Sequence, residues 1–349
     1  MNWRLKAQLQ NLIAAFPSDF SYELYFFLQR HFGGLRTVNP ISRFQAGIAV
    51  MERLRRQQLQ TKDKAFLEVG TGRCVDLPIA LWLCGAGRVI TVDLNPYLAP
   101  DLIRQSLTFV RNNRALVEAT FGDYAGQPWF AGRLELLLSN ETSDIRTLLT
   151  ALNIEYLAPV DATGLALQDK SVDYHVSFAV LEHIPPSTLC GILKEGRRLL
   201  RSGGRFIHLV DFSDHFSHSD DSITAVNFLR FSEKQWARCA GNRYMYHNRM
   251  RVDEFTELLA ESGLSIDLLE TSVDQRALEA LQKGFTGENL MAYAKKNPMQ
   301  VASLAAPLFM QDKTVPTPEK DTNLGQRYTF SRETTSPFPQ PDAINYSNL

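Results

Sequence analysis

The sequence predicts an α/β fold in which a mostly parallel sheet is covered by helices on both faces. The main observation is the stretch of residues 65–97, where strand and helix patterns alternate. Ala65–Val69 and residues 89–92 are short apolar runs, as buried parallel strands are. Residues 76–84, between them, have the length and apolar content of a helix that ends at a glycine pair. This strand–helix–strand order is typical of a doubly wound sheet.

A glycine turn with two flanking acids follows the first predicted strand. Gly70 and Gly72 lie where a tight turn brings the backbone close to a ligand. Asp93 ends the second predicted strand, where a carboxylate can accept hydrogen bonds from both hydroxyls of a ribose. The dinucleotide fingerprint G-x-G-x-x-G is incomplete, because its last position is Val75. Glu68 would repel phosphates at a helix N-terminus, so the turn favours a cationic ligand.

Composition excludes several classes of protein. The chain has 349 residues, of which 44% are hydrophobic and 21% charged, enough to bury a full core. A formal net charge of −1 argues against a nucleic-acid scaffold, which needs uncompensated Lys and Arg. No segment has the length and uniform apolarity of a membrane span, and no signal peptide is evident. The four cysteines lack C-x-x-C spacing, which predicts reduced thiols in a cytoplasmic protein: Cys74, Cys84, Cys190 and Cys239.

The regions around the glycine turn are predicted to be helical. Residues 1–64 form an N-terminal helical segment that includes the aromatic-rich stretch 22–31. Residues 100–153 separate the second strand from the third, which is too long for a single connecting helix. We therefore expect an insertion of helices close to the carboxyl ends of the strands. Such an insertion either shapes a ligand pocket or extends the core.

The strand pattern resumes after residue 153. A predicted third strand, residues 154–159, leads to Asp161-Ala162, and a fourth, Val172–Phe178, leads to Val180-Leu181-Glu182-His183-Ile184. A helix, a Gly203-Gly204 turn and a fifth strand at 205–210 follow.

These motifs together resemble class I S-adenosylmethionine-dependent methyltransferases. The acid and G-x-G turn of residues 68–72, the acid–small pair 161–162 and the V-L-E-H-I segment 180–184 carry the resemblance over residues 65–210, excepting the insertion. It implies a Rossmann-like, seven-stranded, mostly parallel sheet, and membership of a bacterial subgroup with the V-L-E-H-I motif. The N-terminal helices would then cover the cofactor, or simply pack on the core. The implied cofactor is S-adenosyl-L-methionine, contacted by Glu68, Gly70, Thr71, Gly72, Asp93, Leu94, Asp161, Ala162 and Phe178.

Two histidines are candidate proton acceptors, because ligands in such sheets lie beyond the carboxyl ends of the strands. His215 belongs to the polar loop 211–221 after the fifth strand, and His183 follows the fourth. If His183 has no catalytic role, it instead organises its loop or contacts the cofactor. We expect no metal, because ligands from the polar loop 211–221 alone, without a companion acid after the fourth strand, make a poor octahedral site. His208, within a strand, is expected to be a core residue.

The C-terminal third is less informative. Arg249 and Arg251 are candidates for binding a carboxylate or phosphate of the acceptor, or for a salt bridge at the start of the helix predicted at 252–262. A final strand is predicted at 265–270, C-terminal helices at 276–310, and a disordered tail at 311–349.

We therefore expect transfer of a methyl group from S-adenosylmethionine to a small or medium organic acceptor, at oxygen. Two alternatives stay open. One is an enzyme that uses the same cofactor for aminopropyl transfer or cyclisation. The other is a non-catalytic cofactor-binding partner protein. We expect neither nucleic acid nor membrane as a partner.

Overall fold

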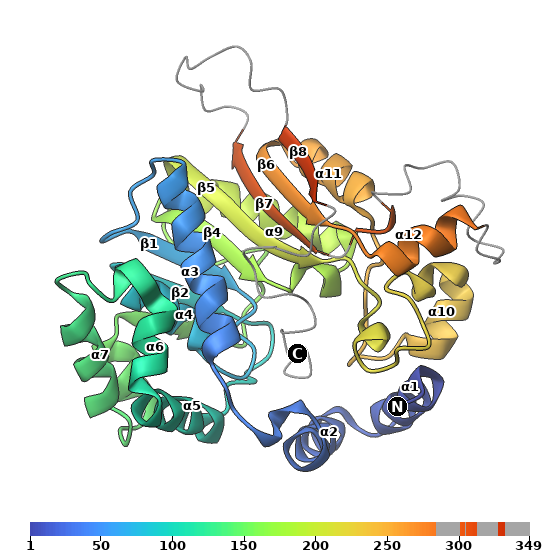
Figure 1. The fold of residues 1–349 in the computed structure, drawn as a ribbon, viewed down its shortest axis with the longest axis horizontal. Helices are drawn as coiled ribbons and strands as arrows, with labels where there is room; N and C mark the ends of the chain where they lie inside the picture. Colours follow the sequence, from blue (N-terminus) through green and yellow to red (C-terminus); the bar gives the residue numbers. More distant parts are fainter. Residues whose placement is uncertain (284–300, 304, 313–326, 332–349) are drawn as a thin grey trace.

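The computed structural model describes residues 1–283, 301–303, 305–312 and 327–331, which build one mixed β-sheet with helices on both faces (Figure 1). The strands lie in the order β3-β2-β1-β4-β5-β7-β6-β8. The bounds of the strands are β1 Ala65–Val69, β2 Arg88–Val92, β3 Ile154–Leu157, β4 Val172–Phe178, β5 Leu200–Asp211, β6 Leu264–Ser272, β7 Ala305–Asp312 and β8 Arg327–Ser331.

The first seven strands in this order form the predicted mostly parallel sheet. Neighbouring strands from β3 to β5 run parallel, whereas β7 is antiparallel to both β5 and β6. An eighth strand, β8, extends the edge parallel to β6. The expected doubly wound fold is confirmed, with one strand more than the seven predicted.

The C-terminal part differs from the prediction. The predicted helices at 276–310 include α12 (Gln275–Gln282), but β7 occupies 305–312 and is a strand. The predicted tail at 311–349 likewise contains the end of β7 and the whole of β8. An apolar run of this length fits a buried strand and a buried helix equally well, and pairing with β5 and β6 decides between them. Residues 284–300, 304, 313–326 and 332–349 of these two predicted segments lie outside the described residues.

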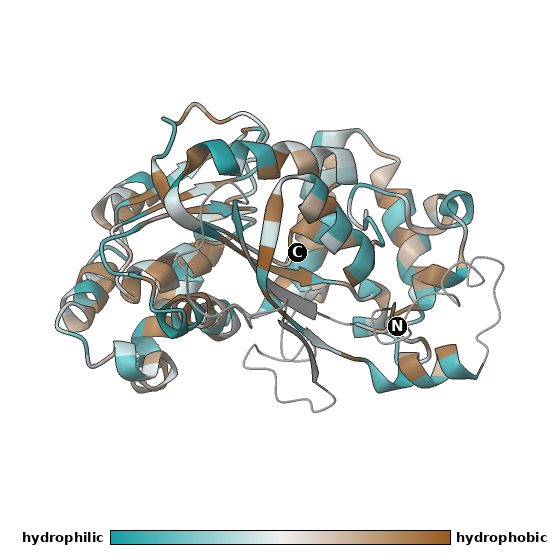
Figure 2. Cartoon of the chain, turned by 90° about the horizontal axis from the view of Figure 1, so that it is seen from above, coloured by the Kyte–Doolittle hydropathy of each residue, from teal (hydrophilic) through white to brown (hydrophobic). Residues whose placement is uncertain are grey.

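Helices cover both faces of the sheet because successive strand residues point to opposite sides. Phe66 of β1 belongs to a core with α3 and α4, whereas Leu67 belongs to a core with α9 and α11. The α-helices are α1 Trp3–Ala14, α2 Ser18–Phe32, α3 Ile41–Arg56, α4 Asp76–Leu83, α5 Pro100–Asn112, α6 Arg114–Phe121, α7 Phe130–Ser139, α8 Ile145–Ala151, α9 Pro186–Leu199, α10 Glu233–Ala240, α11 Val252–Glu261 and α12. Many of these helices contain both hydrophobic and hydrophilic residues, as amphipathic helices that pack on a core do (Figure 2). Within the described residues, no helix has the length and apolarity needed to cross a membrane.

The inserted helices α5 to α8 extend the core. Trp129 donates its indole N–H to the carbonyl of Leu83 at 3.3 Å, and Arg133 donates to the carbonyl of Ala86 at 2.9 Å. Leu83 and Ala86 lie at the C-terminal end of α4, near the amino ends of the strands. The expectation that the insertion gathers at the carboxyl ends is therefore wrong for α7, although the N-terminal part of α5 reaches that side through a hydrogen bond from Ser106 to Asp76 at 2.6 Å.

The N-terminal helices lie along one side of the molecule and contact the loops at the carboxyl ends of the strands (Figure 1). The ring of Tyr22 lies 5.4 Å from that of Tyr97, and the guanidinium of Arg73 lies 4.4 Å from the ring centre of Phe26. Arg73 follows the glycine turn and Tyr97 follows β2. Helix α2 therefore packs directly beside the predicted cofactor loops.

Candidate active site

The glycine turn after β1 has the conformation that its residues predict. Gly70 and Gly72 have φ angles of +90° and +67°, which L-residues with side chains rarely adopt. A Cβ on Gly70 would lie 2.4 Å from Val180, so this glycine lets the loop after β4 pack against the turn. A Cβ on Gly72 would meet no atom within 4 Å. The backbone at Gly72 therefore borders open space that a ligand can enter.

Asp93 is held beside this open space. Its Oδ2 accepts a hydrogen bond from the N–H of Gly72 at 2.9 Å, and its Oδ1 accepts one from Asn95 at 2.9 Å. Burial raises the pKa of Asp93, although these backbone N–H groups and Arg73 oppose the shift. Each carboxylate oxygen keeps a second lone pair. The residue is thus fixed in place and still able to accept hydrogen bonds from a ligand.

The loop after β3 lies next to Asp93. The N–H of Val160 donates to the carbonyl of Asp93 at 2.9 Å, and the exposed Asp161 accepts from the N–H of Thr163 at 2.8 Å. Ala162 is partly buried and Leu94, after Asp93, is 67% exposed. The structure therefore brings together Gly72, Asp93 and the predicted 161–162 pair at one edge of the sheet.

Glu68 and Phe178 lie behind this edge. Glu68 is 4% exposed and accepts a hydrogen bond from Thr91, whose hydroxyl is also 2.6 Å from that of Thr71. Burial raises the pKa of Glu68 to about 8, even though Thr91 and Arg43 oppose it. At neutral pH the carboxyl group is mostly protonated, so the expected charge on it is absent.

Phe178 packs against α3. Its ring centre is 4.8 Å from the guanidinium of Arg43, and its carbonyl accepts from Arg43 at 3.4 Å. We missed Arg43 in the sequence, because it lies far from every motif. The positive charge of Arg43 opposes the rise in pKa that burial causes at Glu68, Asp76 and Glu182.

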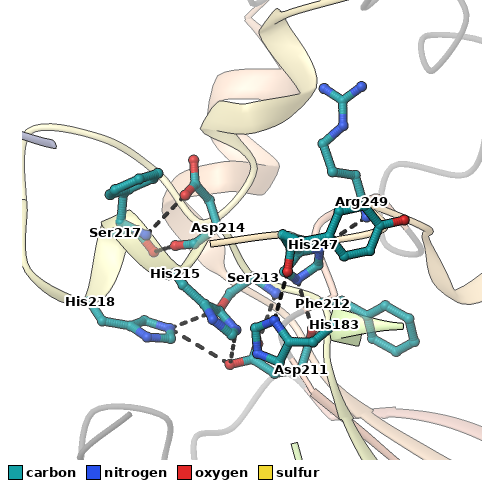
Figure 3. Close-up of polar contacts among 12 residues, drawn as sticks. His183, Asp211, Phe212, Ser213, Asp214, His215, Ser217, His218, His247 and Arg249 are labelled. Carbon is teal, nitrogen blue, oxygen red and sulfur yellow. Dashed lines mark hydrogen bonds and ion pairs between the residues drawn. The ribbon is translucent and has the colours of Figure 1, made fainter. Parts of the chain in front are cut away.

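Four histidines gather at the carboxyl ends of β4 and β5 (Figure 3). His183 lies in the 3₁₀ helix η3 (Leu181–His183) and His215 in η4 (His215–His218), with ring centres 4.9 Å apart. The ring of His247 lies 5.9 Å from His183 and 5.2 Å from His215. His218 stacks on His215 at 5.2 Å. Both predicted catalytic histidines therefore belong to one cluster.

A buried carboxylate anchors this cluster. Asp211, the last residue of β5, is fully buried, and its Oδ2 lies 3.3 Å from Nε2 of His215 and 3.8 Å from Nε2 of His218. Burial by itself would raise the pKa of Asp211, but its interactions with these two histidines hold the pKa below the ordinary range. Asp211 is therefore a carboxylate, and it can orient His215.

His183 is a weak base in this setting. Its Nδ1 lies 2.8 Å from the carbonyl of Tyr246, which can only accept, so Nδ1 carries the proton. Burial, with the nearby His215, lowers the pKa of His183 to about 4. A neutral imidazole with a lone pair on Nε2 results. This form favours binding over proton abstraction at neutral pH.

His208 is confirmed as a core residue. It is fully buried in β5, 3.2 Å from Nδ1 of His175 and 2.7 Å from the hydroxyl of Ser177.

The predicted acceptor-binding arginines have structural roles. Arg249 donates to the carbonyls of Phe228 and Phe231 at 2.9 Å, pairs with Glu233 and extends away from the histidines (Figure 3). Arg251, fully buried, donates to the carbonyls of Val301 and Ser303 at 2.6 Å and also to that of Phe212. Backbone carbonyls thus occupy both guanidinium groups, and the binding of an acceptor by these arginines stays a prediction.

The alternative that the sequence left open is also only partly met. The carboxylate of Glu254 accepts from the backbone N–H of Arg251 at 2.8 Å and so caps the start of α11. Two residues that we did not assign a role, Glu182 and His247, lie in the cluster instead. The position of Glu182 directly before His183, after a buried strand, was the signal available for it.

The sheet order, with its antiparallel β7, and the loops at the carboxyl ends define the fold of class I S-adenosylmethionine-dependent methyltransferases. A family model described as a methyltransferase domain matches residues 139–208, which include β3, β4 and α9. No curated protein that was compared with the chain matches it.

Solved structures with a similar fold include three methyltransferases. An S-adenosylmethionine-dependent methyltransferase from Methanosarcina mazei is 16% identical, with a TM-score of 0.41 over 74% of this chain and 96% of that one. Magnesium protoporphyrin IX methyltransferase from Synechocystis is 11% identical, with a TM-score of 0.41 over 78% and 84%. Geranyl diphosphate C-methyltransferase from Streptomyces coelicolor is 11% identical, with a TM-score of 0.39 over 75% and 78%.

Proposed function

We propose that this protein transfers a methyl group from S-adenosylmethionine to a hydroxyl oxygen of a small or medium organic acceptor. The observation that carries the proposal is the pairing of Gly72 with Asp93 beside open space, at the carboxyl ends of β1 and β2. Ligands of doubly wound sheets bind at this edge, where the strand order reverses between β1 and β4. The loop after β3, with Asp161 and Ala162, lies beside the same edge.

Each cofactor-contacting residue has a defined task in this proposal. S-adenosylmethionine, when bound, supplies an electrophilic methyl group on a sulfonium sulfur. Asp93 accepts the ribose hydroxyls, and Asp161 with the N–H of Ala162 recognises the adenine. Gly72, Thr71 and Leu94 border the cofactor. Gly70, Glu68 and Phe178 are positioning residues that contact other side chains and not the cofactor. Gly70 packs against Val180, Glu68 bonds to Thr91, and the ring of Phe178 contacts Arg43.

The histidine cluster lies on the acceptor side. A lone pair of the hydroxyl oxygen forms the new C–O bond, the electrons of the S–C bond stay on sulfur, and the hydroxyl proton goes to a base. His215 is the first candidate for this base, since Asp211 would stabilise its protonated ring. His183 is the second, weakened by its lowered pKa. Alignment and exclusion of water supply the rest of the rate enhancement.

The remaining expectations fit this proposal. The four cysteines are free thiols, which supports a reducing compartment such as the cytoplasm. The balanced net charge supports a small-molecule acceptor and not a nucleic acid.

Calorimetry with S-adenosylmethionine and S-adenosylhomocysteine tests the cofactor site. We expect one site on the wild-type chain and an affinity about 10 to 100-fold lower for Asp93→Asn, because hydrogen bonds to a charged group contribute about 1.5–3 kcal/mol. Asp63→Asn is the matched control, since Asp63 is exposed and forms an ion pair with the neighbouring Lys62. Equal binding by wild type and Asp93→Asn, or none by wild type, would refute the proposal. Methyl-labelled cofactor and a product that is S-adenosylhomocysteine then separate methyl transfer from aminopropyl transfer.

A further inference from the structure

Three potential metal ligands meet between the loops that follow β4 and β5. Glu182, His183 and His215 each offer one ligand atom, and these atoms all lie within 4.8 Å of one another. Glu182 and His183 are adjacent in η3, whereas His215 begins η4. Two separate loops thus hold a carboxylate and two imidazoles at the distance that one ion would bridge.

Glu182 is the unusual member of this group. It is 1% exposed, and among the described residues neither carboxylate oxygen has a well-formed hydrogen bond. A buried carboxyl group without good partners is costly. A cation between Glu182 and the histidines would remove that cost.

The hydrogen bonds of the two imidazoles also favour binding of a cation. His183 donates from Nδ1 to the carbonyl of Tyr246, which leaves the buried lone pair of Nε2 without a hydrogen bond in the described part of the chain. Asp211 lies 3.3 Å from His215, in the arrangement by which carboxylates orient metal-binding histidines. His247 is different, because its Nδ1 accepts from Arg249 and its Nε2 faces the carbonyl of Asp211. His247 therefore supports the loops.

We propose that Glu182, His183 and His215 bind one divalent ion of the first transition series, with Asp211 as a positioning residue. Two imidazoles with one carboxylate suit Zn²⁺, Fe²⁺, Co²⁺ or Mn²⁺, whereas Mg²⁺ and Ca²⁺ prefer oxygen ligands alone. The ion's two positive charges balance the carboxylates of Glu182 and Asp211. The prediction of no metal assumed that no acid follows β4, but Glu182 is such an acid.

A role in catalysis follows, and this part rests on the proposed function. With the ion bound, His183 and His215 are ligands and no longer bases. The open coordination positions would take the acceptor's hydroxyl oxygen and lower its pKa, and its proton would leave to water before the oxygen attacks the methyl carbon. The acceptor class would then be a hydroxyl compound that binds a metal through oxygen.

Metal binding is tested on the full chain without S-adenosylmethionine. The protein is stripped with a chelator and titrated with Zn²⁺, Co²⁺, Mn²⁺ or Mg²⁺ alone, by calorimetry and by metal analysis after dialysis. We expect one Zn²⁺ or Co²⁺ per chain, binding at least 100-fold tighter than Mg²⁺. Glu182→Gln and His183→Ala should each weaken Zn²⁺ binding by about 100-fold or more, beyond the usual effect of an outer-sphere residue. Glu257 and His31 are both exposed, so Glu257→Gln and His31→Ala should bind Zn²⁺ as the wild-type chain does.

A spectroscopic measurement on the wild-type chain covers the case in which a variant fails to fold. Cu²⁺ bound at this site should show pulsed electron paramagnetic resonance couplings from two imidazole rings. Absence of stoichiometric binding, or couplings from no imidazole, would overturn the proposal. So would unchanged Zn²⁺ affinity in a folded His183→Ala chain. Because the cofactor is absent from these titrations, their failure is distinguishable from failure of cofactor binding to Asp93.

Discussion

Glu68, the acid that precedes the glycine turn, is buried in β1 and accepts a hydrogen bond from Thr91 of the neighbouring β2. In the motif, this acid suggests a charge that faces a cationic ligand. In the structure, burial raises its pKa to about 8, so the charge appears only in alkaline solution. Glu68 therefore joins β1 to β2 beside the glycine turn, and its ionisation opposes folding.

The pH dependence of stability follows from this shift. The pKa of Glu68 is higher in the folded chain than in the unfolded chain, where it is about 4.5. The folded state thus binds the extra proton, and the stability it contributes is full below pH 4.5 and is lost as the pH rises through about 8. Glu68→Gln, which cannot ionise, should lose less stability between pH 5 and pH 8.5, by on the order of 1–3 kcal/mol.

Urea unfolding of both chains across this pH range measures the difference. Glu257→Gln, on the exposed side of α11, serves as the control for removing a carboxylate. Parallel stability curves for Glu68→Gln and wild type would show that Glu68 does not change its proton on unfolding.

Arg251 shows a second way in which burial decides a residue's role. Its guanidinium donates to carbonyls of Phe212, Val301 and Ser303, from two remote parts of the chain. We expect Arg251→Met to lower the free energy of unfolding by about 3–5 kcal/mol, because buried carbonyls would lose their donors. Denaturant titration checks this, with the exposed Arg146→Met as control. A stable Arg251→Met chain with weakened acceptor binding alone would restore the role predicted from sequence.

These residues mark what the sequence can and cannot predict about the site. Asp93 and Gly72 were predictable because the strand, turn and acid that place them are close in sequence. The roles of Arg249 and Arg251 were not, because a cation in a sequence gives no sign that distant carbonyls will surround it. The proximity of Glu182 to His215 could not be predicted, because the two loops that carry these residues are brought together by the pairing of β4 with β5.

At the scale of elements, local patterns predicted the central strands well, and the elements that failed have ambiguous patterns. Strands β1, β2 and β4 are short apolar runs between turns, and the sheet buries them on both faces. Pro307 interrupts the apolar segment that forms β7, which argues against a strand in the interior of a sheet, and its partners β5 and β6 are far away in sequence. The position of the helical insertion, too, depends on contacts of Trp129 and Arg133 with α4 that no local pattern encodes.

An aromatic cluster of Tyr22, Tyr25, Tyr97 and Tyr244 holds helix α2 beside the predicted cofactor loops. Tyr25 stacks on Tyr244 with ring centres 4.1 Å apart, and Tyr22 contacts both Tyr244 and Tyr97. Tyr244→Ala removes the contacts of Tyr244 with Tyr22 and Tyr25, each pair being worth about 0.5–1.5 kcal/mol beyond the area it buries, and leaves the Tyr22–Tyr97 contact in place. We therefore expect amide hydrogen exchange in α2 to accelerate by about 10-fold or more, while exchange in α4 stays unchanged.

Hydrogen-exchange mass spectrometry resolves the two helices. Phe27→Ala is the control, because Phe27 is an aromatic residue of α2 that is 51% exposed. Protection of α2 that is equal in Tyr244→Ala and wild type would mean that other contacts hold the helix in place.

At the scale of the whole molecule, the sheet is completed by a strand from the far end of the chain. β7 lies between β5 and β6 and hydrogen-bonds to both, so without it two interior strand edges would be exposed. Asp312 at its end receives two hydrogen bonds from Arg197 of α9 at 2.9 Å, and Met310 lies in the core with α9 and α11. β7 thus joins the first five strands to β6 within the sheet.

A chain that ends at residue 303 should therefore lose its cooperative unfolding transition, because it lacks β7 and leaves the edges of β5 and β6 unpaired. A chain that ends at residue 326 keeps β7 and lacks β8, which pairs only with β6 at the border of the sheet. We expect this second chain to unfold cooperatively, at a lower midpoint than the full chain. Circular dichroism during thermal unfolding compares the three proteins. If the chain ending at 303 unfolds as sharply and at the same temperature as the one ending at 326, β7 is not required to join the two parts of the sheet.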